Sequence, residues 1–473
     1  MTVSSTQKKQ AKLELILLGL GVLWLSIGVA HQAFPPSHAA QVTAVVLRWL
    51  GIASFSVFAF RRKSLTPWIF VAMVAGIELG FDAPHIALQT KVLSDIFLRL
   101  VKTIVAPLIL STLVVGIAGH GDLKSVGRMG IKSIVLFEVI TTLALGVGLL
   151  AINISKAGVG LAMPVVASAA SKLPAAPPPT HWDDFLLHIF PENIAKSIAE
   201  GQILQVVVFA IIFAIALASL SEAKRAPMLR LCESLSEVMF GFTNIVMYLA
   251  PLAVFAALAV TVGSTGLGVL VNLGKLVATL YGALAVFVVV VLLPVCLIFK
   301  VPIVRFLRAV AEPATIAFAT SSSEAALPTA MEQMEALGVP RRIVAFVIPT
   351  GYSFNLVGST LYMSIACIFV AQAAGMHLSI GTQLTMMATL MLTSKGIAGV
   401  PRAILVVLFA TAATFGLPEA PIAIILGVDA VMDMARTMLN VVGNCLASVV
   451  IARSEGEFGT EKPSAAVLAG VAE

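Results

Sequence analysis

Apolar residues run along this chain in long, nearly uninterrupted stretches that short polar connections separate. Each stretch is roughly 18 to 30 residues long, which is the length of helix that spans a hydrocarbon layer of about 30 Å. The spans predicted up to residue 300 are 14–31, 41–60, 66–84, 93–118, 129–154, 202–221, 234–262 and 268–299. The pattern therefore predicts an all-α, polytopic membrane protein.

Beyond residue 300 the chain stays apolar, but small and polar residues interrupt it in three places. These breaks are Ala319–Pro328, Ile348–Ser359 and Thr393–Pro401. The first and third lie inside apolar stretches, 303–337 and 380–414, that are too short for two full spans plus a loop. We predict a re-entrant helical hairpin for each stretch, with helices at 340–373 and 416–452. Paired broken segments of this kind indicate the substrate site of a transporter.

The composition supports a membrane protein. Of the 473 residues, 59% are hydrophobic and only 11% are charged, and the mean hydropathy is +1.02. A soluble domain has about a quarter charged residues, so this chain has too few charges to cover a water-facing surface. Nucleic-acid binding and intrinsic disorder are thereby excluded as main functions.

The four cysteines have no metal-binding or redox spacing, so we expect buried thiols, no cofactor and no metal. No cleavable signal peptide is evident.

Membrane topology explains the net charge of +6. Lysine and arginine cluster in every second connection between spans, as in Arg61-Arg62-Lys63 after the second one. The positive-inside rule places these connections in the cytoplasm. We therefore expect a multi-pass protein of the inner cell membrane with both termini in the cytoplasm.

The last predicted helix carries a polar stripe. Offsets of three or four residues place Asp429, Asp433, Arg436, Asn440 and Asn444 on one helical face. Charges inside a bilayer are costly, so they mark substrate or ion pathways by default. An arginine offers a planar fork to a carboxylate, and an aspartate suits an ammonium. The alternative interpretation is an Asp–Arg pair that only locks the fold.

Two breaks add further candidates. The serines at 321–323 can offer hydroxyls and backbone N–H groups, although a serine triplet is also typical of a simple turn. At the second hairpin tip, Gly396, Gly399 and Pro401 suit a flexible gate. The alternative is an ordinary glycine-containing turn without a role in gating.

Four ordered motifs resemble the dicarboxylate/amino acid:cation symporter family, which includes the glutamate transporters. They are Ser-Ser-Ser-Glu-Ala-Ala-Leu-Pro (321–328), Gly-Tyr-Ser-Phe-Asn-Leu-Val-Gly-Ser (351–359), Ser-Lys-Gly-Ile-Ala-Gly-Val-Pro (394–401) and Asp-Met-Ala-Arg-Thr-Met-Leu-Asn-Val-Val-Gly-Asn (433–444). The resemblance covers about 66–452 and is greatest to the bacterial proton-coupled glutamate/aspartate symporters. It implies eight transmembrane helices plus two re-entrant hairpins, a homotrimer and an elevator-type movement.

The resemblance also implies a division of the chain. Residues 1–65 have no place in the family pattern and are expected to form an extra transmembrane hairpin; because 14–60 carries no polar stripe, it should be dispensable for transport chemistry. The other expected parts are scaffold helices at 66–128, a transport-domain helix at 129–154, an outer loop with scaffold helices at 155–262, a transport domain at 263–452 and a cytoplasmic tail at 453–473.

Matching the motifs residue by residue gives expected roles. Arg436 matches the arginine that binds the substrate's side-chain carboxylate, and Asp433 matches the aspartate that holds its amino group. The other expected substrate ligands are Thr437, Asn440, Ser321, Ser323, Ser359 and Val400. The expected gate is Gly396, Gly399, Pro401 and Arg402. The candidates for cation coupling are Glu138, Thr141, Glu324, Asn355, Asp429 and Asn444.

Three positions depart from the family pattern. Val357 replaces an aspartate that is a sodium ligand in sodium-coupled members, and Asn444 replaces another such aspartate. A sodium ion wants anionic or carbonyl oxygens, which valine does not offer. Arg402 replaces a small residue and adds a charge at the gate.

The sequence thus predicts a transporter and not an enzyme: a secondary symporter of L-glutamate or L-aspartate, coupled to protons and without strong sodium dependence. Its partners are a small acidic substrate, H⁺, membrane lipids and its own copies. A C4-dicarboxylate symporter is the alternative within carriers, and an uncoupled facilitator, channel or substrate sensor on the same fold is the alternative outside them. An intramembrane protease is excluded, because the histidines lie at or beyond the ends of the spans and Asp429 and Asp433 share one helix.

Overall fold

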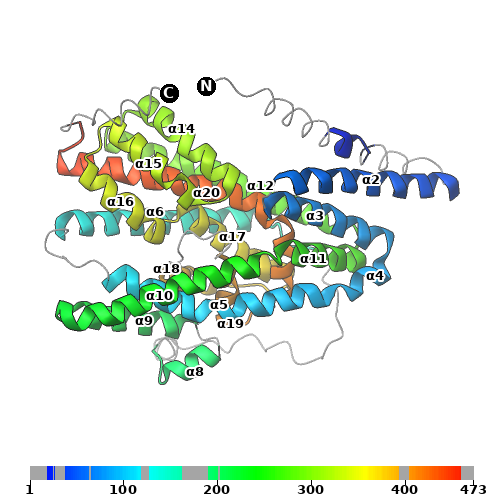
Figure 1. Cartoon of the computed structure of the whole chain (residues 1–473), viewed down its shortest axis with the longest axis horizontal. Coiled ribbons are helices and arrows are strands. Elements are labelled where there is room, and N and C mark those ends of the chain that lie inside the picture. Colours follow the sequence, from blue (N-terminus) through cyan, green and yellow to red (C-terminus); the bar gives the residue numbers. More distant parts are fainter. Residues whose placement is uncertain are drawn as a thin grey trace. The chain divides into compact units, whose positions relative to one another are not determined.

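The structure is a computed structural model that describes residues 19–24, 26, 38–62, 65–118, 127–161, 190–200, 203–393 and 404–459. These residues form helices and the turns between them, with no strand among them (Figure 1). They divide into two compact units. The first contains the described residues of 1–100 with Asn244–Val271 and Ala423–Ala430. The second contains those of 101–243, Asn272–Ile422 and 431–473.

The first unit is built on close packing between α3 (Leu65–Asp82) and α11 (Ala250–Thr265), with α4 (Pro84–Gln89) beside α11. Two glycines of α3 allow this approach. A Cβ added at Gly80 would lie 2.6 Å from the carbonyl oxygen of Ala259, and one at Gly76 would overlap the backbone of Phe255. Small residues at a helix contact bring two backbones together inside a membrane, which maximises their van der Waals contact.

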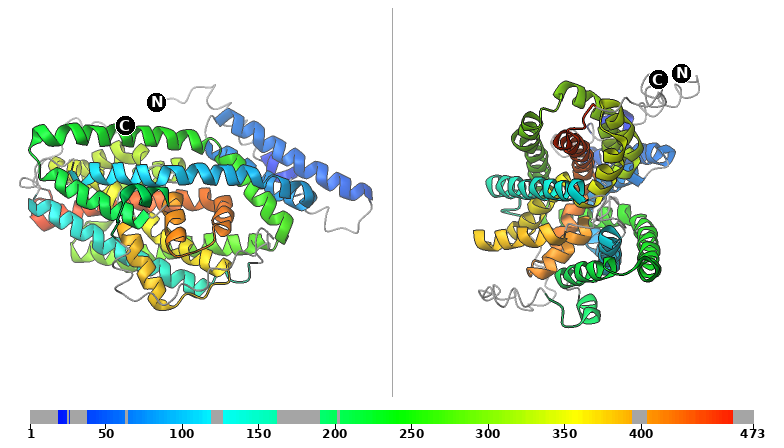
Figure 2. Two further views of the ribbon diagram at one scale, coloured as in Figure 1. Left: turned by 90° about the horizontal axis from the view of Figure 1, so that it is seen from below. Right: turned by 90° about the vertical axis from the view of Figure 1, so that its left-hand side faces the viewer.

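Helix α2 (His38–Arg62) lies along α3 (Figures 1 and 2) and is attached to it by buried charges. The Arg48 side chain is 2% exposed; its Nε donates to Glu78 at 2.7 Å, and it also pairs with Asp82. The indole Nε1 of Trp49 donates to Asp82 at 3.2 Å, and the Arg48 guanidinium lies 5.7 Å from the centre of the Phe81 ring. The segment 14–60 therefore carries a buried charge that contacts the family-like part of the chain. Most of the predicted first span, 14–31, lies outside the described residues.

The second unit contains most of the remaining helices. They are α6 (Gly127–Ser155), α8 (Ile194–Ala199), α9 (Ile203–Ala218), α12 (Val269–Phe287) with the π-helical turn Val288–Leu292, α13 (Leu293–Ile298), α14 (Ile303–Thr320), α15 (Ser323–Leu337), α16 (Arg341–Phe354), α17 (Val357–Ala373), α18 (Ile380–Thr393) and α19 (Ile404–Thr414). Four helices contribute residues to both units: α5 (Lys91–Ala118), α10 (Glu222–Met247), α20 (Ala420–Glu455) and α12, whose residues 269–271 belong to the first unit.

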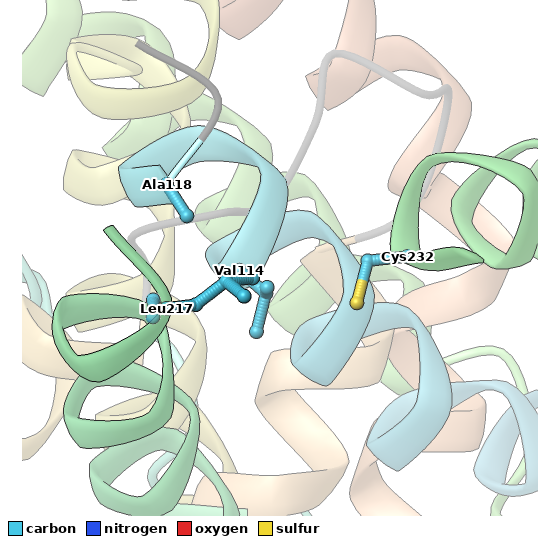
Figure 3. Packing of buried hydrophobic residues seen from close by; sticks show 5 residues of the cluster. Val114, Ala118, Leu217 and Cys232 are labelled. Atoms are coloured by element: carbon cyan, nitrogen blue, oxygen red, sulfur yellow. The ribbon is translucent and has the colours of Figure 1, made fainter. Parts of the chain in front are cut away.

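The core of the second unit is buried and close-packed. Helix α17 is buried along nearly its whole length and packs against α6, where Gly148 approaches Leu361 and Ser364. A separate apolar cluster joins Val114 and Ala118 of α5 to Leu217 of α9 and Cys232 of α10 (Figure 3). All four cysteines are buried free thiols, as their spacing predicts.

The predicted breaks agree with the structure where residues are described. Helices α14 and α15 pack against each other as the first hairpin, and the turn between them falls at Ser321 and Ser322. The predicted helix 340–373 is interrupted at Asn355 and Leu356, inside the second predicted break. The third break, 393–401, lies almost wholly outside the described residues.

One predicted span is wrong as drawn. The span 234–262 is not continuous: α10 ends at Met247 and α11 begins at Ala250. Pro251 in the first turn of α11 has no N–H to donate, so it favours a new helix start there. By length and hydropathy, six helices among the described residues suffice to cross a membrane, or seven if α10 and α11 form one span.

Candidate functional site

Five polar side chains of α20 are buried together in the second unit. Asp433, Arg436, Thr437, Asn440 and Asn444 are each at most 6% exposed. The helix carries them on one face because Asp433, the adjacent Arg436 and Thr437, Asn440 and Asn444 follow one another at three or four residues, close to the 3.6-residue turn. Buried charges and amides are stable only when they are paired or hydrogen-bonded, so their partners define the site.

Arg436 and Asp433 form an ion pair within α20. The Arg436 Nε donates to the Asp433 Oδ1 at 2.8 Å, and the Thr437 hydroxyl donates to the same oxygen at 3.2 Å. Residues three apart on a helix are neighbours, so the guanidinium is already paired within α20. A guanidinium has five N–H donors in a planar fork, and the bond from Nε uses one of them.

Tyr362 of α17 was missed by the sequence argument. The Arg436 guanidinium lies over its ring, 4.4 Å from the ring centre, and Tyr362 is fully buried. A cation over an aromatic face is attracted by the ring's quadrupole, more so where water is excluded. The available signal was spacing: Tyr362 follows Ser359 by three residues and therefore shares a face of α17 with it.

The break between α16 and α17 turns backbone donors toward α20. The Asn440 Oδ1 accepts from the backbone N–H of Gly358 at 2.8 Å and from that of Ser359 at 3.2 Å. The Asn440 Nδ2 in turn donates to the Ser359 hydroxyl at 2.9 Å. Gly358 is required for this approach, since a Cβ there would overlap the backbone of Arg436. Asn440 thus satisfies the unpaired N-terminal amides of α17.

A second contact lies one turn further along α20. The Asn355 Nδ2 donates to the Asn444 Oδ1 at 2.9 Å, and both residues are fully buried. Among the described residues, no hydrogen bond satisfies Asn355 Oδ1, Asn444 Nδ2 or the hydroxyl of buried Tyr352. Buried polar atoms without partners are rare, so this polar contact between α16 and α20 differs from the apolar packing around it.

Val357 closes one side of this region with hydrocarbon. It is fully buried, and a Cβ added at Gly443 would lie 2.8 Å from its Cγ2 and 3.9 Å from Asn355 Nδ2. Two of the three departures noted in the sequence, Val357 and Asn444, therefore lie in the same region, and neither side chain is a carboxylate. The oxygens that remain near them are neutral.

The tip of the first hairpin shows a tight, capped turn. Ser321 has a left-handed backbone (φ 52°), and the Ser322 hydroxyl caps α15 by accepting from the Ala325 N–H at 3.3 Å. Ser323 is buried, whereas Glu324 is exposed. The hydrogen bonds described for these residues stay within the tip, so the structure does not join Ser321 or Ser323 to α20.

The remaining candidates lie on α6, on the first half of α20 or outside the described residues. Thr141 of α6 is buried and donates to the Phe137 carbonyl at 2.7 Å, and the half-buried Glu138 accepts from Thr142 through its own carbonyl at 2.6 Å. Asp429 is buried on the part of α20 that belongs to the first unit. The gate candidates Gly396, Gly399, Val400, Pro401 and Arg402 lie outside the described residues.

Comparison of the sequence with known proteins matches the chain to transporters. A sequence model of the sodium:dicarboxylate symporter family matches residues 65–454. The chain is 44% identical over 415 residues to a proton/glutamate-aspartate symporter of Escherichia coli, which covers 85% of this chain and 95% of that protein. It is 41% identical over 409 residues to a proton/sodium-glutamate symport protein of Geobacillus stearothermophilus, covering 85% and 97%.

A third relative carries a different name. A C4-dicarboxylate transport protein of Solibacter usitatus is 42% identical over 401 residues, covering 84% of this chain and 94% of the relative. Residues 1–64 lie outside the family match. The match over most of the chain confirms the resemblance seen in the four motifs, and the chain belongs to the sodium:dicarboxylate symporter family, a family of multi-pass membrane transporters.

Proposed function

We propose that this protein is a secondary symporter of L-glutamate and L-aspartate, coupled to protons and without strong sodium dependence. The observation that carries the proposal is the buried Arg436–Asp433 pair beside the broken α16–α17 helix. The names of the relatives from E. coli and G. stearothermophilus support the same substrate class.

The charges of the pair match those of an acidic amino acid. A substrate carboxylate can accept from the Arg436 fork, and the substrate ammonium can exchange for that fork as the partner of Asp433. The Thr437 hydroxyl bonds to Asp433 of the pair, and the Asn440 amide and the Ser359 hydroxyl, which bond to each other, offer further polar contacts. We propose that Ser321, Ser323 and Val400, from the two hairpins, complete the site around the main-chain carboxylate.

A C4-dicarboxylate is the second candidate, because relatives with that name are nearly as similar. Such a substrate has two carboxylates and no amine. Asp433 is buried, so water would screen its repulsion of such a dianion only weakly, and binding would be unfavourable. The structure therefore favours the amino acid.

Uptake into proteoliposomes distinguishes the two. Labelled aspartate and glutamate should be taken up, and succinate should be taken up at least tenfold more slowly, since an unpaired buried carboxylate costs more than about 1.4 kcal/mol. Asp433→Asn removes the repulsion, so its preference for the amino acids over succinate should shrink. Succinate uptake as fast as that of both amino acids in the unaltered protein would refute the assignment.

The coupling ion follows from the surroundings of Val357. A dehydrated Na⁺ needs anionic or several carbonyl oxygens, and Val357 and Asn444 supply no carboxylate there. An acidic substrate still carries negative charge through the bilayer. A carboxylate that takes up a proton can compensate that charge, and we propose Glu138 and Glu324 as the proton carriers, with Asp429 orienting its neighbours.

An imposed pH gradient, acid outside, should therefore drive uptake when choline replaces sodium. Glu138→Gln or Glu324→Gln should abolish the stimulation by the gradient, whereas Glu332→Gln, an exposed carboxylate on the same helix as Glu324, should not. Uptake that requires sodium and ignores the gradient would contradict the proposal. Uptake that is indifferent to both would indicate an uncoupled facilitator.

We further propose the family's assembly and movement: a homotrimer of the inner membrane with cytoplasmic termini, eight transmembrane helices, two re-entrant hairpins and an elevator-like transport domain at 129–154 and 263–452. The second hairpin, with Gly396, Gly399, Pro401 and Arg402, would be its gate. Native mass spectrometry in mild detergent should show a trimer. A spectrum of monomers and dimers alone would count against the assembly.

A further inference from the structure

A groove of about 420 Å³ lies on the surface of the first unit between α2 and α3. Ser56, Val57, Phe60 and Arg61 of α2 line it together with Trp68 of α3. Positions 57, 60 and 61 of α2 share one helical face, so the groove follows the helix. It lies in the part of the molecule that residues 38–62 add to the family-matched region.

Contacts at two places along α2 hold it against α3. Ala59 is fully buried and packs with Ile52 and Val71 in a small apolar cluster between α2 and α3. The Arg48 contacts with Glu78 and Asp82 attach the other end of α2. The groove is therefore a fixed feature of the packed pair.

The walls of the groove are apolar. Val57, Phe60 and Trp68 are 48%, 78% and 36% exposed, so they offer hydrocarbon and aromatic surface to the surroundings. The Ser56 hydroxyl donates to the Ile52 carbonyl at 2.9 Å and so adds little polarity. A wall of this kind suits an acyl chain and offers nothing to a free inorganic ion.

The mouth of the groove is cationic. Arg61 is exposed and makes no ion pair or hydrogen bond within the described part of the chain. It begins the run Arg61-Arg62-Lys63, which is typical of a membrane–water boundary. Trp68 lies at the same end, and its indole N–H has no partner among the described residues; tryptophan favours the headgroup level, where this donor can meet a phosphate or ester oxygen.

We propose that this groove binds an anionic phospholipid, with an acyl chain along Val57, Phe60 and Trp68 and the phosphate at Arg61. Charge complementarity selects the ligand: the lining contains a cation and no acid, so a headgroup with net negative charge is preferred over a zwitterionic one. The site belongs to the N-terminal addition, which gives that segment a function in lipid recognition besides its attachment to α3.

Native mass spectrometry of the full-length protein, titrated with phosphatidylglycerol or phosphatidylcholine, tests this. Phosphatidylglycerol should be retained about fivefold more, and Arg61→Gln should remove that preference. Arg305→Gln is the matched control, since Arg305 is an exposed arginine of α14 in the other unit. Equal retention of both lipids, or an equal loss in the Arg61 and Arg305 variants, would overturn the proposal.

A second variant tests the shape of the groove independently of the charge of Arg61. Val57→Trp fills the groove without altering any charged group, so it should also lower retention of phosphatidylglycerol several-fold. If Val57→Trp leaves lipid retention unchanged but changes the number of subunits, the groove is a contact between copies of the chain and the proposal fails.

Discussion

Replacing Arg436 with alanine should weaken binding of aspartate and glutamate by about 3 kcal/mol, roughly 150-fold. The substrate carboxylate loses charge-assisted hydrogen bonds in a buried place where they are strong, and Asp433 loses its partner in the empty site. Isothermal titration calorimetry on the purified protein measures the effect. Arg436→Lys keeps the charge but not the planar fork, so its affinity should lie between those of the unaltered protein and Arg436→Ala.

Arg436 also stabilises the fold through Asp433 and Tyr362, so its loss can lower stability as well as affinity. Thermal unfolding of each variant should therefore accompany the calorimetry, and Arg436→Ala with Asp433→Asn removes both charges of the pair. Arg305→Ala, an exposed arginine of α14, should bind like the unaltered protein. If Arg436→Ala stays folded and binds the amino acids with full affinity, Arg436 is structural and the site lies elsewhere.

Arg48→Met should destabilise the protein by about 3 to 5 kcal/mol, because it leaves the Glu78 and Asp82 carboxylates buried without a cation. Their side chains are only 12% and 15% exposed, so water cannot take the place of the lost guanidinium. The fall in melting temperature is measured by fluorescence in detergent. Trp49→Phe, which removes one hydrogen bond to Asp82, should cost about 1 kcal/mol.

A rescue experiment separates this electrostatic role from a role in transport. Glu78→Gln with Asp82→Asn should restore most of the stability that Arg48→Met loses. The same two substitutions should allow residues 1–62 to be deleted with aspartate uptake retained, as expected for a segment outside the transport chemistry. A rescued, folded deletion without uptake would show that the N-terminal segment takes part in transport. No destabilisation by Arg48→Met would show that the buried pair contributes nothing to the fold.

Much of the fold and of the candidate site follows from local patterns in the sequence. The apolar runs are long enough to predict helices, because a helix inside a membrane satisfies its own backbone groups. The breaks at Ser321–Ser322 and Asn355–Leu356 fall where small and polar residues interrupt those runs. The stripe on α20 follows from helical periodicity alone, and Asp433, Arg436 and Asn440 are buried as it predicts.

Contacts between distant segments could not be read in this way. Whether the Arg436 guanidinium is paired depends on rotamers and on Tyr362, which lies 74 positions before it on another helix. The place of Val357 against Gly443, and the bond from Asn355 to Asn444, depend on how the break between α16 and α17 packs against α20. The end of α10 at Met247 was missed because a proline's effect depends on whether packing restores the lost hydrogen bond.

The N-terminal segment shows the division most clearly. One arginine in an apolar run gives no periodic signal, so the sequence by itself determined only that residues 41–60 suit a membrane helix. The tertiary structure decided that this helix is attached to α3, because Glu78 and Asp82 lie one turn apart and both face Arg48. The physical reason is general: hydrophobic period is a property of neighbours along the chain, whereas the cost of a buried charge is settled by whichever residue the fold places beside it.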